Sequence, residues 1–277
     1  YDLSNDMYKT FLDKSLMYSS GIYENSNTTL EDAQDKKVSR MIEKCQIKSD
    51  HHVLEIGSGW GTVAIQIAKK TGARVTTTTI SNEQYKLAKE RIKSEGLEDK
   101  INIILKDYRE LEGEFDRIIS IEMLEAVGEK YLSVFFKKCN TLLSKTGVIS
   151  LQVITIPENR YKSYCNSSDW IRKYIFPGGH LPSLTHISQI LSTHTNLTID
   201  NVENIGPHYG LTLADWRTRF NNNLEKITSL GFDDKFIRMW NYYLTLCEAA
   251  FNLRYVNDLQ IVITKPMNSS LKKVYRK

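Results

Sequence analysis

The chain has 277 residues, of which 41% are hydrophobic and 25% charged, and its net charge at pH 7 is +4. These values are typical of a globular protein with one large α/β domain or two small ones. No apolar run approaches the roughly 18 residues of a membrane span. The charge is also too small and too dispersed to indicate a nucleic-acid partner.

Four cysteines are scattered along the chain without a C-x-x-C pair, and the histidines form no recognised ligand motif. This distribution argues against a metal site and against a disulfide framework, and it favours the reducing cytoplasm. No signal-peptide pattern precedes the first expected elements. The sequence begins with Tyr1, which leaves open whether the natural chain starts earlier.

Residues 1–47 are expected to form a helical cap. Aromatic residues are frequent up to position 23, and the plain interpretation is a helix packed on the edge of a sheet. The alternative is an aromatic wall facing a positively charged ligand. Residues 29–47 predict a second helix, with Thr28 as its N-cap and Glu31 completing a capping box.

The stretch from 52 to 64, HVLEIGSGWGTVA, predicts a buried strand, a glycine turn and a helix. This is the first βα unit of a nucleoside-binding, doubly wound sheet. Gly57, Gly59 and Gly61 lack a Cβ and so let the backbone approach a ligand closely. The helix N-terminus is then expected to face an anionic group with free N–H donors.

Three details bear on the ligand of this turn. Glu55 lies before the first glycine, in the turn region, and the spacing is G-x-G-x-G rather than G-x-G-x-x-G. Both features favour S-adenosylmethionine over a dinucleotide. The second strand ends near Thr79 without an acidic residue, which argues against NAD. A glycine turn without a ligand is the remaining alternative.

Strands and helices then alternate. Strands are expected at 74–80, 101–105, 115–124 and 147–156, and helices at 62–70, 82–94 and 131–143. This rhythm predicts an α/β fold with a right-handed, parallel, three-layer sheet, and a cofactor-binding core over residues 48–157.

After Pro157 the alternation breaks in an aromatic-rich stretch. Residues 158–192 and 206–256 are interpreted as insertions that cover a substrate, within a single domain. Strands are expected at 197–205 and 259–264, with helices at 213–228 and 233–254. The tail over 266–277 is basic and is expected to fray.

Several segments together resemble the family of cyclopropane-fatty-acid-phospholipid synthases and mycolic acid cyclopropane synthases. The resemblance runs from Tyr1 to about Lys265. The segments are YDLSNDMYKTFLDKSLMYSSGIY, VLEIGSGWG, TISNEQ, SIEMLEAVGEKY, YIFPGGHLPS, NIGPHYGLTLADW and RMWNYYLTLCEAAF.

The resemblance implies a class I methyltransferase fold that acts on an unsaturated, phospholipid-bound acyl chain at a membrane surface. In that family the alkene attacks the methyl group of S-adenosylmethionine and leaves a carbocation. A bound bicarbonate then removes a proton and a cyclopropane ring closes. Aromatic side chains such as Tyr8, Tyr18 and Phe176 would shield the cation from water.

Matching motifs carry over two sets of residues. The cofactor set is Tyr18, Ser19, Glu55, Gly57, Gly59, Gly61, Thr79, Gln84, Tyr108 and Arg109, the last two near the adenine. The bicarbonate set is Ser20, Glu125, Gln152, the main chain of Ile154, and Tyr209. A first-turn helix position for Glu125 and a core position for Tyr209 are the structural alternatives.

The sequence departs from the family pattern at three positions. Ser20 stands where cysteine is usual, and Gln152 and Ala126 stand where histidine is frequent. A serine hydroxyl can still donate a hydrogen bond, but a glutamine cannot exchange a proton. These changes bear on the deprotonation step and therefore on the product.

Four functions remain open: a cyclopropane synthase, a C-methyltransferase that leaves a methylene or methyl branch, a small-molecule N-methyltransferase, and a non-catalytic lipid- or cofactor-binding module. A long apolar tunnel would favour a lipid, and a short polar pocket an amine. A homodimer is also left open.

Overall fold

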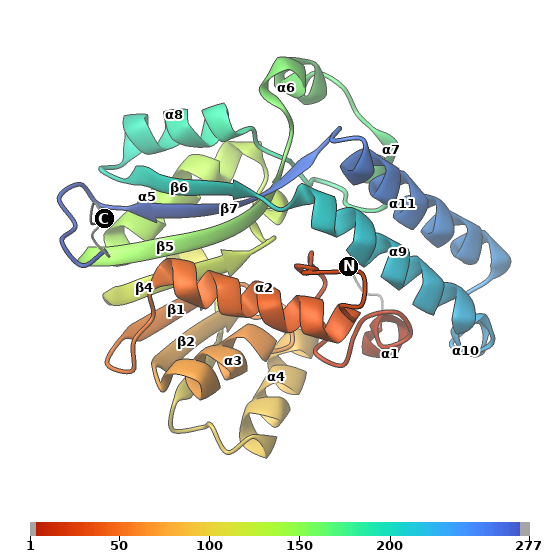
Figure 1. Ribbon diagram of the computed structural model, residues 1–277, viewed down its shortest axis with the longest axis horizontal. Helices are drawn as coiled ribbons and strands as arrows, with labels where there is room; N and C mark the ends of the chain where they lie inside the picture. The colour runs from red at the N-terminus through yellow and green to blue at the C-terminus, as the bar shows by residue number, and fades with distance from the viewer. Residues whose placement is uncertain (1–3, 272–277) are drawn as a thin grey trace.

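The computed structural model describes residues 4–271, and its centre is a seven-stranded sheet of order β3-β2-β1-β4-β5-β7-β6 (Figure 1). The strands are β1 (His52–Ile56), β2 (Arg74–Thr79), β3 (Ile101–Leu105), β4 (Phe115–Ile121), β5 (Leu143–Thr155), β6 (Thr198–Asn204) and β7 (Asn257–Thr264). The predicted parallel arrangement is confirmed for β1 to β5. It is wrong at the other edge, because β7 lies antiparallel between β5 and β6.

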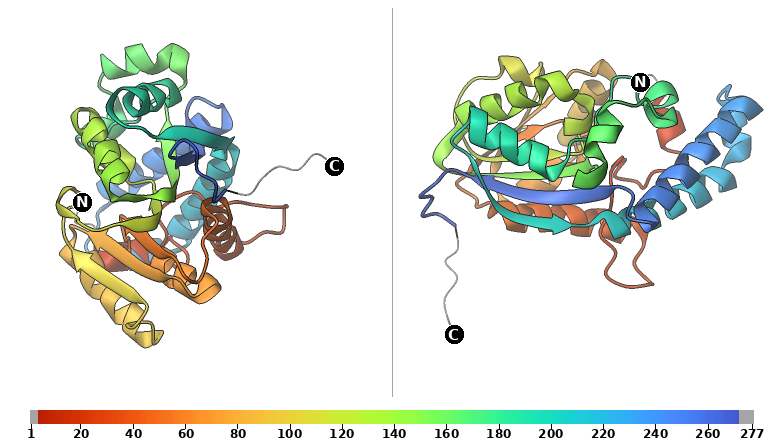
Figure 2. Two further views of the ribbon diagram at one scale, coloured as in Figure 1. Left: turned by 90° about the vertical axis from the view of Figure 1, so that its left-hand side faces the viewer. Right: turned by 90° about the horizontal axis from the view of Figure 1, so that it is seen from above.

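Helices cover both faces of the sheet, as Figure 2 shows. One face carries α2 (Leu30–Cys45), α3 (Thr62–Thr71) and α4 (Asn82–Ser94), and the other α5 (Leu132–Leu142) and α8 (Leu184–His194). Neighbouring strand residues alternate between the two cores, so that Ile118 packs toward α5 and Ile119 toward α2. This is the alternation that a pleated strand imposes.

The start of α2 differs from the prediction by one residue. Thr29, not Thr28, is the N-cap, and its Oγ1 accepts the Asp32 N–H at 3.1 Å. The predicted capping box is wrong, because Glu31 forms an ion pair with Arg219 of α9 (Gly206–Asn222) at 2.7 Å. A tertiary contact thus takes the carboxylate that the local motif would use.

The N-terminal segment is not the helix that its composition suggested. Only α1 (Asn5–Tyr8) is helical before α2, and Tyr1 lies outside the described residues. Phe11 packs at ring distances of 6.0 and 5.9 Å against Trp216 of α9 and Trp240 of α11 (Asp234–Asn252). These aromatic contacts build a third core away from the sheet.

The chain leaves β4 three residues earlier than predicted. Glu122 adopts a left-handed conformation, with φ of 48°, and short 3-10 turns follow at Leu124–Ala126 and Glu129–Tyr131. Another 3-10 turn, Tyr108–Glu110, follows β3. The break after Ile121 therefore sets where the acidic side chains at this strand end point.

The two insertions have distinct positions. The helices α6 (Glu158–Cys165) and α7 (Trp170–Tyr174) lie beside the ends of the strands, whereas α8 belongs to the helical layer of the sheet. The predicted helix over 213–228 is in fact α9, which begins at Gly206, followed by a separate α10 (Leu224–Ser229). The helices α9 and α11 lie side by side and project beyond the sheet (Figures 1 and 2).

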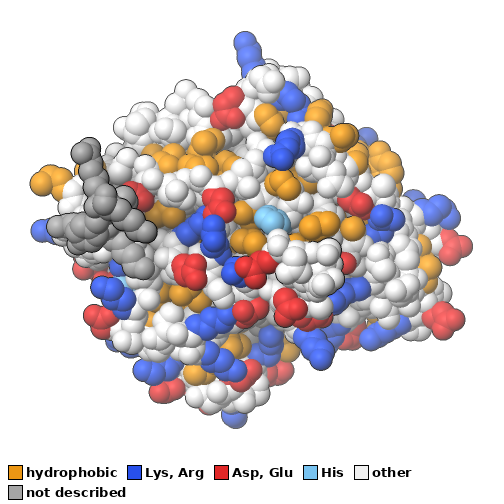
Figure 3. Space-filling model, viewed as in Figure 1, with side chains coloured by type: hydrophobic (Ala, Val, Ile, Leu, Met, Phe, Trp, Pro, Cys, Tyr) orange, Lys and Arg blue, Asp and Glu red, His pale blue; other side chains and the backbone are white. Residues whose placement is uncertain are grey.

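The beginning of the predicted frayed tail is docked on the sheet. Asn268 donates a hydrogen bond to the Gly147 carbonyl at 3.1 Å, and Leu271 packs against the core beneath α2. The basic tail residues Lys272, Lys273, Arg276 and Lys277 lie outside the described residues. Within 4–271, no helix combines the length and apolar character needed to cross a membrane. On the face in Figure 3, acidic and basic side chains are interspersed.

Candidate active site

A cavity of about 1810 Å³ opens at the carboxyl ends of the parallel strands. Its walls come from the N-terminal segment, the glycine turn, the break after β4, the insertion at 159–181, α9 and α11. It lies where the connections from β1 and β4 diverge, which is the usual ligand position in a doubly wound sheet. Its volume exceeds the roughly 300–1,000 Å³ of a typical small-molecule pocket.

The glycine turn lines this cavity through Gly57 and Gly59. Their φ angles are +96° and +48°, and a Cβ on Gly59 would meet nothing within 4 Å. The N–H groups of Gly57 and Ser58, at the start of the turn, both donate to the Thr78 carbonyl, whereas the predicted free donors belong to the N-terminus of the helix that follows. The turn therefore offers a close backbone surface more than an anion site.

Gly61 serves packing and does not line the cavity. A Cβ at this position would lie 3.0 Å from the Cβ of Ala88 in α4. Position 61 therefore requires a glycine because α3 and α4 approach each other there. This packing role differs from the predicted role in ligand contact.

Glu55 lies within β1 and not in the turn. Its carboxyl accepts a hydrogen bond from Thr77 Oγ1 at 2.6 Å and another from the Ala64 N–H. Burial raises its pKa to about 8. The N-terminal turn of α3 therefore faces a side chain of the protein itself.

The remaining predicted cofactor residues separate into two groups. Thr79 and Gln84 line the cavity and are joined by a hydrogen bond of 2.8 Å. Tyr108 and Arg109 do not line it. Tyr108 packs on Phe135, and Arg109 pairs with Asp107 at 2.7 Å. Their placement near an adenine stays a prediction.

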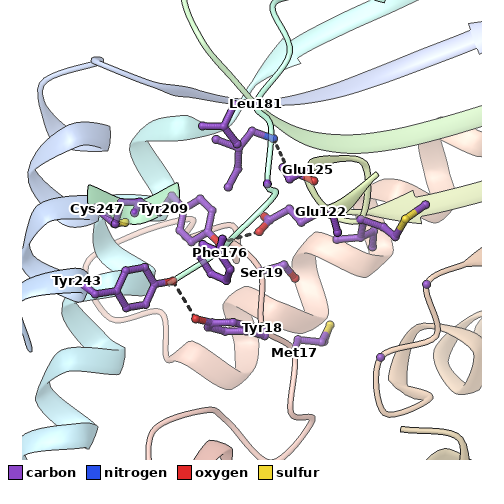
Figure 4. A pocket seen from close by; sticks show the side chains of 18 of the residues that line it. Met17, Tyr18, Ser19, Glu122, Glu125, Phe176, Leu181, Tyr209, Tyr243 and Cys247 are labelled. Carbon is purple, nitrogen blue, oxygen red and sulfur yellow. Dashed lines mark hydrogen bonds between the residues drawn. The ribbon is translucent and has the colours of Figure 1, made fainter. Parts of the chain in front are cut away.

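Aromatic side chains form a wall of the cavity, including Tyr8, Tyr18 and Phe176. The hydroxyl of Tyr18 lies 2.8 Å from that of Tyr243 in α11 (Figure 4). Ser19 also lines the cavity and accepts a hydrogen bond from Lys37 Nζ at 2.5 Å. The N-terminal segment thus takes the wall position that was the alternative to a plain edge helix.

Glu125 and Ile154 meet as the resemblance implied. The Ile154 N–H donates to Glu125 Oε1 at 2.6 Å. The other oxygen, Oε2, is inaccessible to solvent and has no hydrogen-bond partner among the described residues. Burial, and then the nearby Glu122 charge, raises the pKa of Glu125 to about 8. This unpartnered oxygen can bond an incoming group.

Glu122 was not predicted as a site residue, yet its side chain is hydrogen-bonded to three residues that were. Its carboxylate accepts hydrogen bonds from the Ser20 N–H at 2.9 Å and from Gln152 Nε2 at 2.8 Å. It also accepts one from the Tyr209 hydroxyl at 2.6 Å (Figure 4). The Ser20 hydroxyl instead donates to the Gly21 carbonyl. The available signal was the acidic residue at the end of a buried strand, three positions before Glu125.

Two further buried groups stand behind Glu122. Asp258 of β7 accepts a hydrogen bond from Gln152 at 3.1 Å and hydrogen-bonds to Glu122, and burial holds its pKa well above the ordinary value. Lys37 of α2 is fully buried, and burial lowers its pKa to about 8. In the sequence, each of these two groups could have been noticed as a charged residue within an otherwise apolar strand or helix face.

One group of side chains has spacing suitable for a metal ion: Glu129, Cys165 and His180. The Nε2 atom of His180 is already 2.9 Å from the Tyr161 hydroxyl. Because that contact accounts for the imidazole, we assign no metal to the group.

The strand order with an antiparallel β7, the glycine turn after β1 and the cavity above it define a class I S-adenosylmethionine-dependent methyltransferase fold. Residues 1–261 match the family model described as mycolic acid cyclopropane synthetase. The chain belongs to this family.

Named relatives agree with this assignment. The chain is 38% identical over 267 residues to the tuberculostearic acid methyltransferase UfaA1 of Mycobacterium tuberculosis, covering 94% of this chain and 62% of the relative. It is 36% identical to the cyclopropane-fatty-acyl-phospholipid synthase of Escherichia coli K12, covering 98% of this chain and 68% of that protein. The chain thus spans about two thirds of the length of these relatives.

A solved structure shows the same fold. The mycolic acid cyclopropane synthase CmaA1, complexed with SAH and CTAB, superimposes with a TM-score of 0.89 at 26% identity. The superposition covers 96% of this chain and 95% of that one.

Proposed function

We propose that this protein transfers a one-carbon group from S-adenosylmethionine to the cis double bond of an unsaturated, phospholipid-bound acyl chain and closes a cyclopropane ring. The observation that carries this proposal is the single cavity that joins the glycine turn to an apolar wall of α11, with buried carboxyl groups between them. Such a cavity is suited to a nucleoside beside a long acyl chain.

The cofactor would be held by the turn at Gly57 and Gly59, by Thr79 and Gln84, and by the wall at Tyr18 and Ser19. When bound, S-adenosylmethionine supplies an electrophilic methyl group on a cationic sulfur. Ring faces attract cations, so the aromatic wall suits this charge. The open surface above Gly59 gives a backbone approach without a Cβ.

The predicted bicarbonate site fits only in part. The unpartnered Oε2 of Glu125 could bond the hydroxyl of bicarbonate. However, the N–H of Ser20, the amide of Gln152 and the hydroxyl of Tyr209 are already bonded to Glu122. We therefore derive no step through bicarbonate.

The position of Glu122 among these donors also favours a second product. If Glu122 receives the proton, the carbon that loses it depends on where this side chain lies along the acyl chain. A 1,2-hydride shift that moves the cation to the methyl-bearing carbon, followed by proton loss from the methyl group with formation of a double bond, would leave a methylene group. A separate reduction would convert this methylene group to a methyl branch. UfaA1, one of the relatives, is named as a tuberculostearic acid methyltransferase.

The large cavity argues against a small-molecule N-methyltransferase, and the retained Glu125 and Tyr209 argue against a non-catalytic binding module. A phospholipid-bound substrate would require peripheral contact with a membrane surface on the cytoplasmic side. A homodimer stays a prediction.

The test is expression in a host that lacks its own synthase, with methyl-deuterated methionine supplied. Gas chromatography with mass spectrometry should reveal acyl chains heavier by one methylene unit. Two retained deuterium atoms indicate proton loss from the new methyl group, and three indicate loss from the chain. Proton NMR then separates ring from vinylic methylene. Labelled amines without labelled lipids would refute the proposed substrate class.

A further inference from the structure

We propose that the Glu122 carboxylate is the built-in proton acceptor of the reaction and takes the place of a bound bicarbonate. This inference rests on the proposed function for the identity of the proton that is removed. Its structural part, that Glu122 fills the anion position, can be tested without a lipid.

The donors around Glu122 are those that the family resemblance assigns to an anion. Ser20, Gln152 and Tyr209 were predicted to hold bicarbonate, and all three donate to Glu122 at 2.6–2.9 Å. A carboxylate and bicarbonate present the same pair of oxygens on a planar carbon. An added bicarbonate would have to break these three hydrogen bonds before it could use the same donors.

The backbone supports this placement. Glu122 adopts φ of 48°, a left-handed conformation that is unfavourable for a residue with a Cβ. The Glu122 N–H donates to the Gln152 carbonyl at 2.8 Å, which holds the turn in position. The side chain lines the cavity as a result.

Buried ionisable groups surround Glu122. Burial holds the pKa of Asp258 well above its ordinary value and raises that of Glu125 to about 8, so both neighbours resist ionisation. Lys37 is the nearby buried cation. The two Glu122 carboxyl oxygens accept hydrogen bonds from three donors, which is the pattern expected of a carboxylate.

In the proposed step, Glu122 removes a proton from the methylated acyl chain. Once the alkene has taken the methyl group, the acyl chain carries a cation. If a C–H bond of the new methyl group breaks, its electron pair closes the third ring bond. If a C–H bond on a carbon adjacent to the cationic carbon breaks instead, its electron pair forms a carbon–carbon double bond. The proton passes to a Glu122 oxygen, so the cation is neutralised and the carboxylate becomes a carboxylic acid.

The first experiment compares the wild-type protein in buffers purged of carbon dioxide and in buffers with added bicarbonate. We expect its product-forming rate to stay within twofold. Glu122→Gln should lose about a hundredfold in neutral product, the usual range for a general base. Its residual methylated chains should contain alcohol, because water traps a cation that is not deprotonated. Glu225→Gln, an exposed glutamate of α10, serves as the matched control.

The second experiment asks whether bicarbonate binds at all. Carbon-13 NMR with labelled bicarbonate should show no binding to wild-type protein and binding to Glu122→Ala, whose donors are released. Added bicarbonate should raise the amount of product that Glu122→Ala forms at least tenfold. S-adenosylmethionine affinity, measured by calorimetry, should stay within threefold for both variants.

Two results would overturn the inference: a wild-type rate that collapses without bicarbonate and returns with it, or a Glu122→Gln variant that retains its product. If wild-type protein methylates no lipid, the proposed function fails instead. The labelled-bicarbonate comparison then decides the inference by itself, because binding by wild-type protein would contradict it.

Discussion

The hydroxyl of Tyr18 lies 2.8 Å from the hydroxyl of Tyr243, and this contact joins the N-terminal segment to α11 across the cavity. Burial holds the pKa of Tyr18 well above its ordinary value, so the Tyr18 hydroxyl keeps its proton over the physiological pH range. This wall of the cavity is therefore built from two segments that are far apart in the sequence.

A double-mutant cycle should detect this coupling. We expect Tyr18→Phe and Tyr243→Phe each to lower the free energy of unfolding by about 1 kcal/mol. The double variant should lose less than the sum, with an interaction energy of about 1 kcal/mol. Urea unfolding followed by fluorescence measures all four proteins. Strict additivity would show that the two hydroxyls do not stabilise each other.

The glycines of the turn should separate by function. Gly61→Ala forces a Cβ against Ala88 at a φ of +87°, so we expect a loss of about 2 kcal/mol or more in unfolding free energy. Gly59→Ala meets no neighbour within 4 Å and should cost about 1 kcal/mol. Its main effect should be weaker S-adenosylmethionine binding by calorimetry. Equal stability losses at both positions would contradict this division.

Glu55 should make stability depend on pH. Its pKa is about 8 in the folded protein against an ordinary value of 4.5, so the folded state retains a proton that the unfolded chain releases between these values. Stability attributable to Glu55 is therefore full below about pH 4.5 and is lost as the pH rises toward 8. The loss amounts to at most about 5 kcal/mol.

Glu55→Gln removes this titration while keeping an acceptor for Thr77. The difference in unfolding free energy between wild type and variant should thus shift in favour of the variant from pH 5 to pH 8. Denaturant unfolding at the two values measures it. A difference that does not change with pH would show that Glu55 is ionised in the folded state.

Glu125→Gln should separate product formation from cofactor binding. The amide oxygen can still accept the Ile154 N–H, so the local fold and S-adenosylmethionine affinity should change little. Product measured by gas chromatography should fall by roughly a hundredfold, because an amide cannot release or take up the proton that the Glu125 carboxyl group can exchange. Equal losses in binding and in product would refute a role for Glu125 in the chemical step.

Much of the fold was predictable because its signals are local. The strands at 52–56 and 101–105 and the helix at 82–94 follow from short hydrophobic patterns. The glycine turn was recognised from its spacing. The N-terminal helix was predicted wrongly, because contacts of Phe11 with two distant helices decide that segment.

For the candidate site, the sequence by itself identified Glu125, Ile154, Tyr209 and the turn through motif and resemblance. Only the tertiary structure revealed that Glu122 occupies the donors of Ser20, Gln152 and Tyr209, and that Asp258 and Lys37 stand behind it. The physical reason is that these groups come from six separate segments of the chain. Their charges depend on burial, and their hydrogen bonds on the backbone turn after β4, neither of which a sequence pattern records.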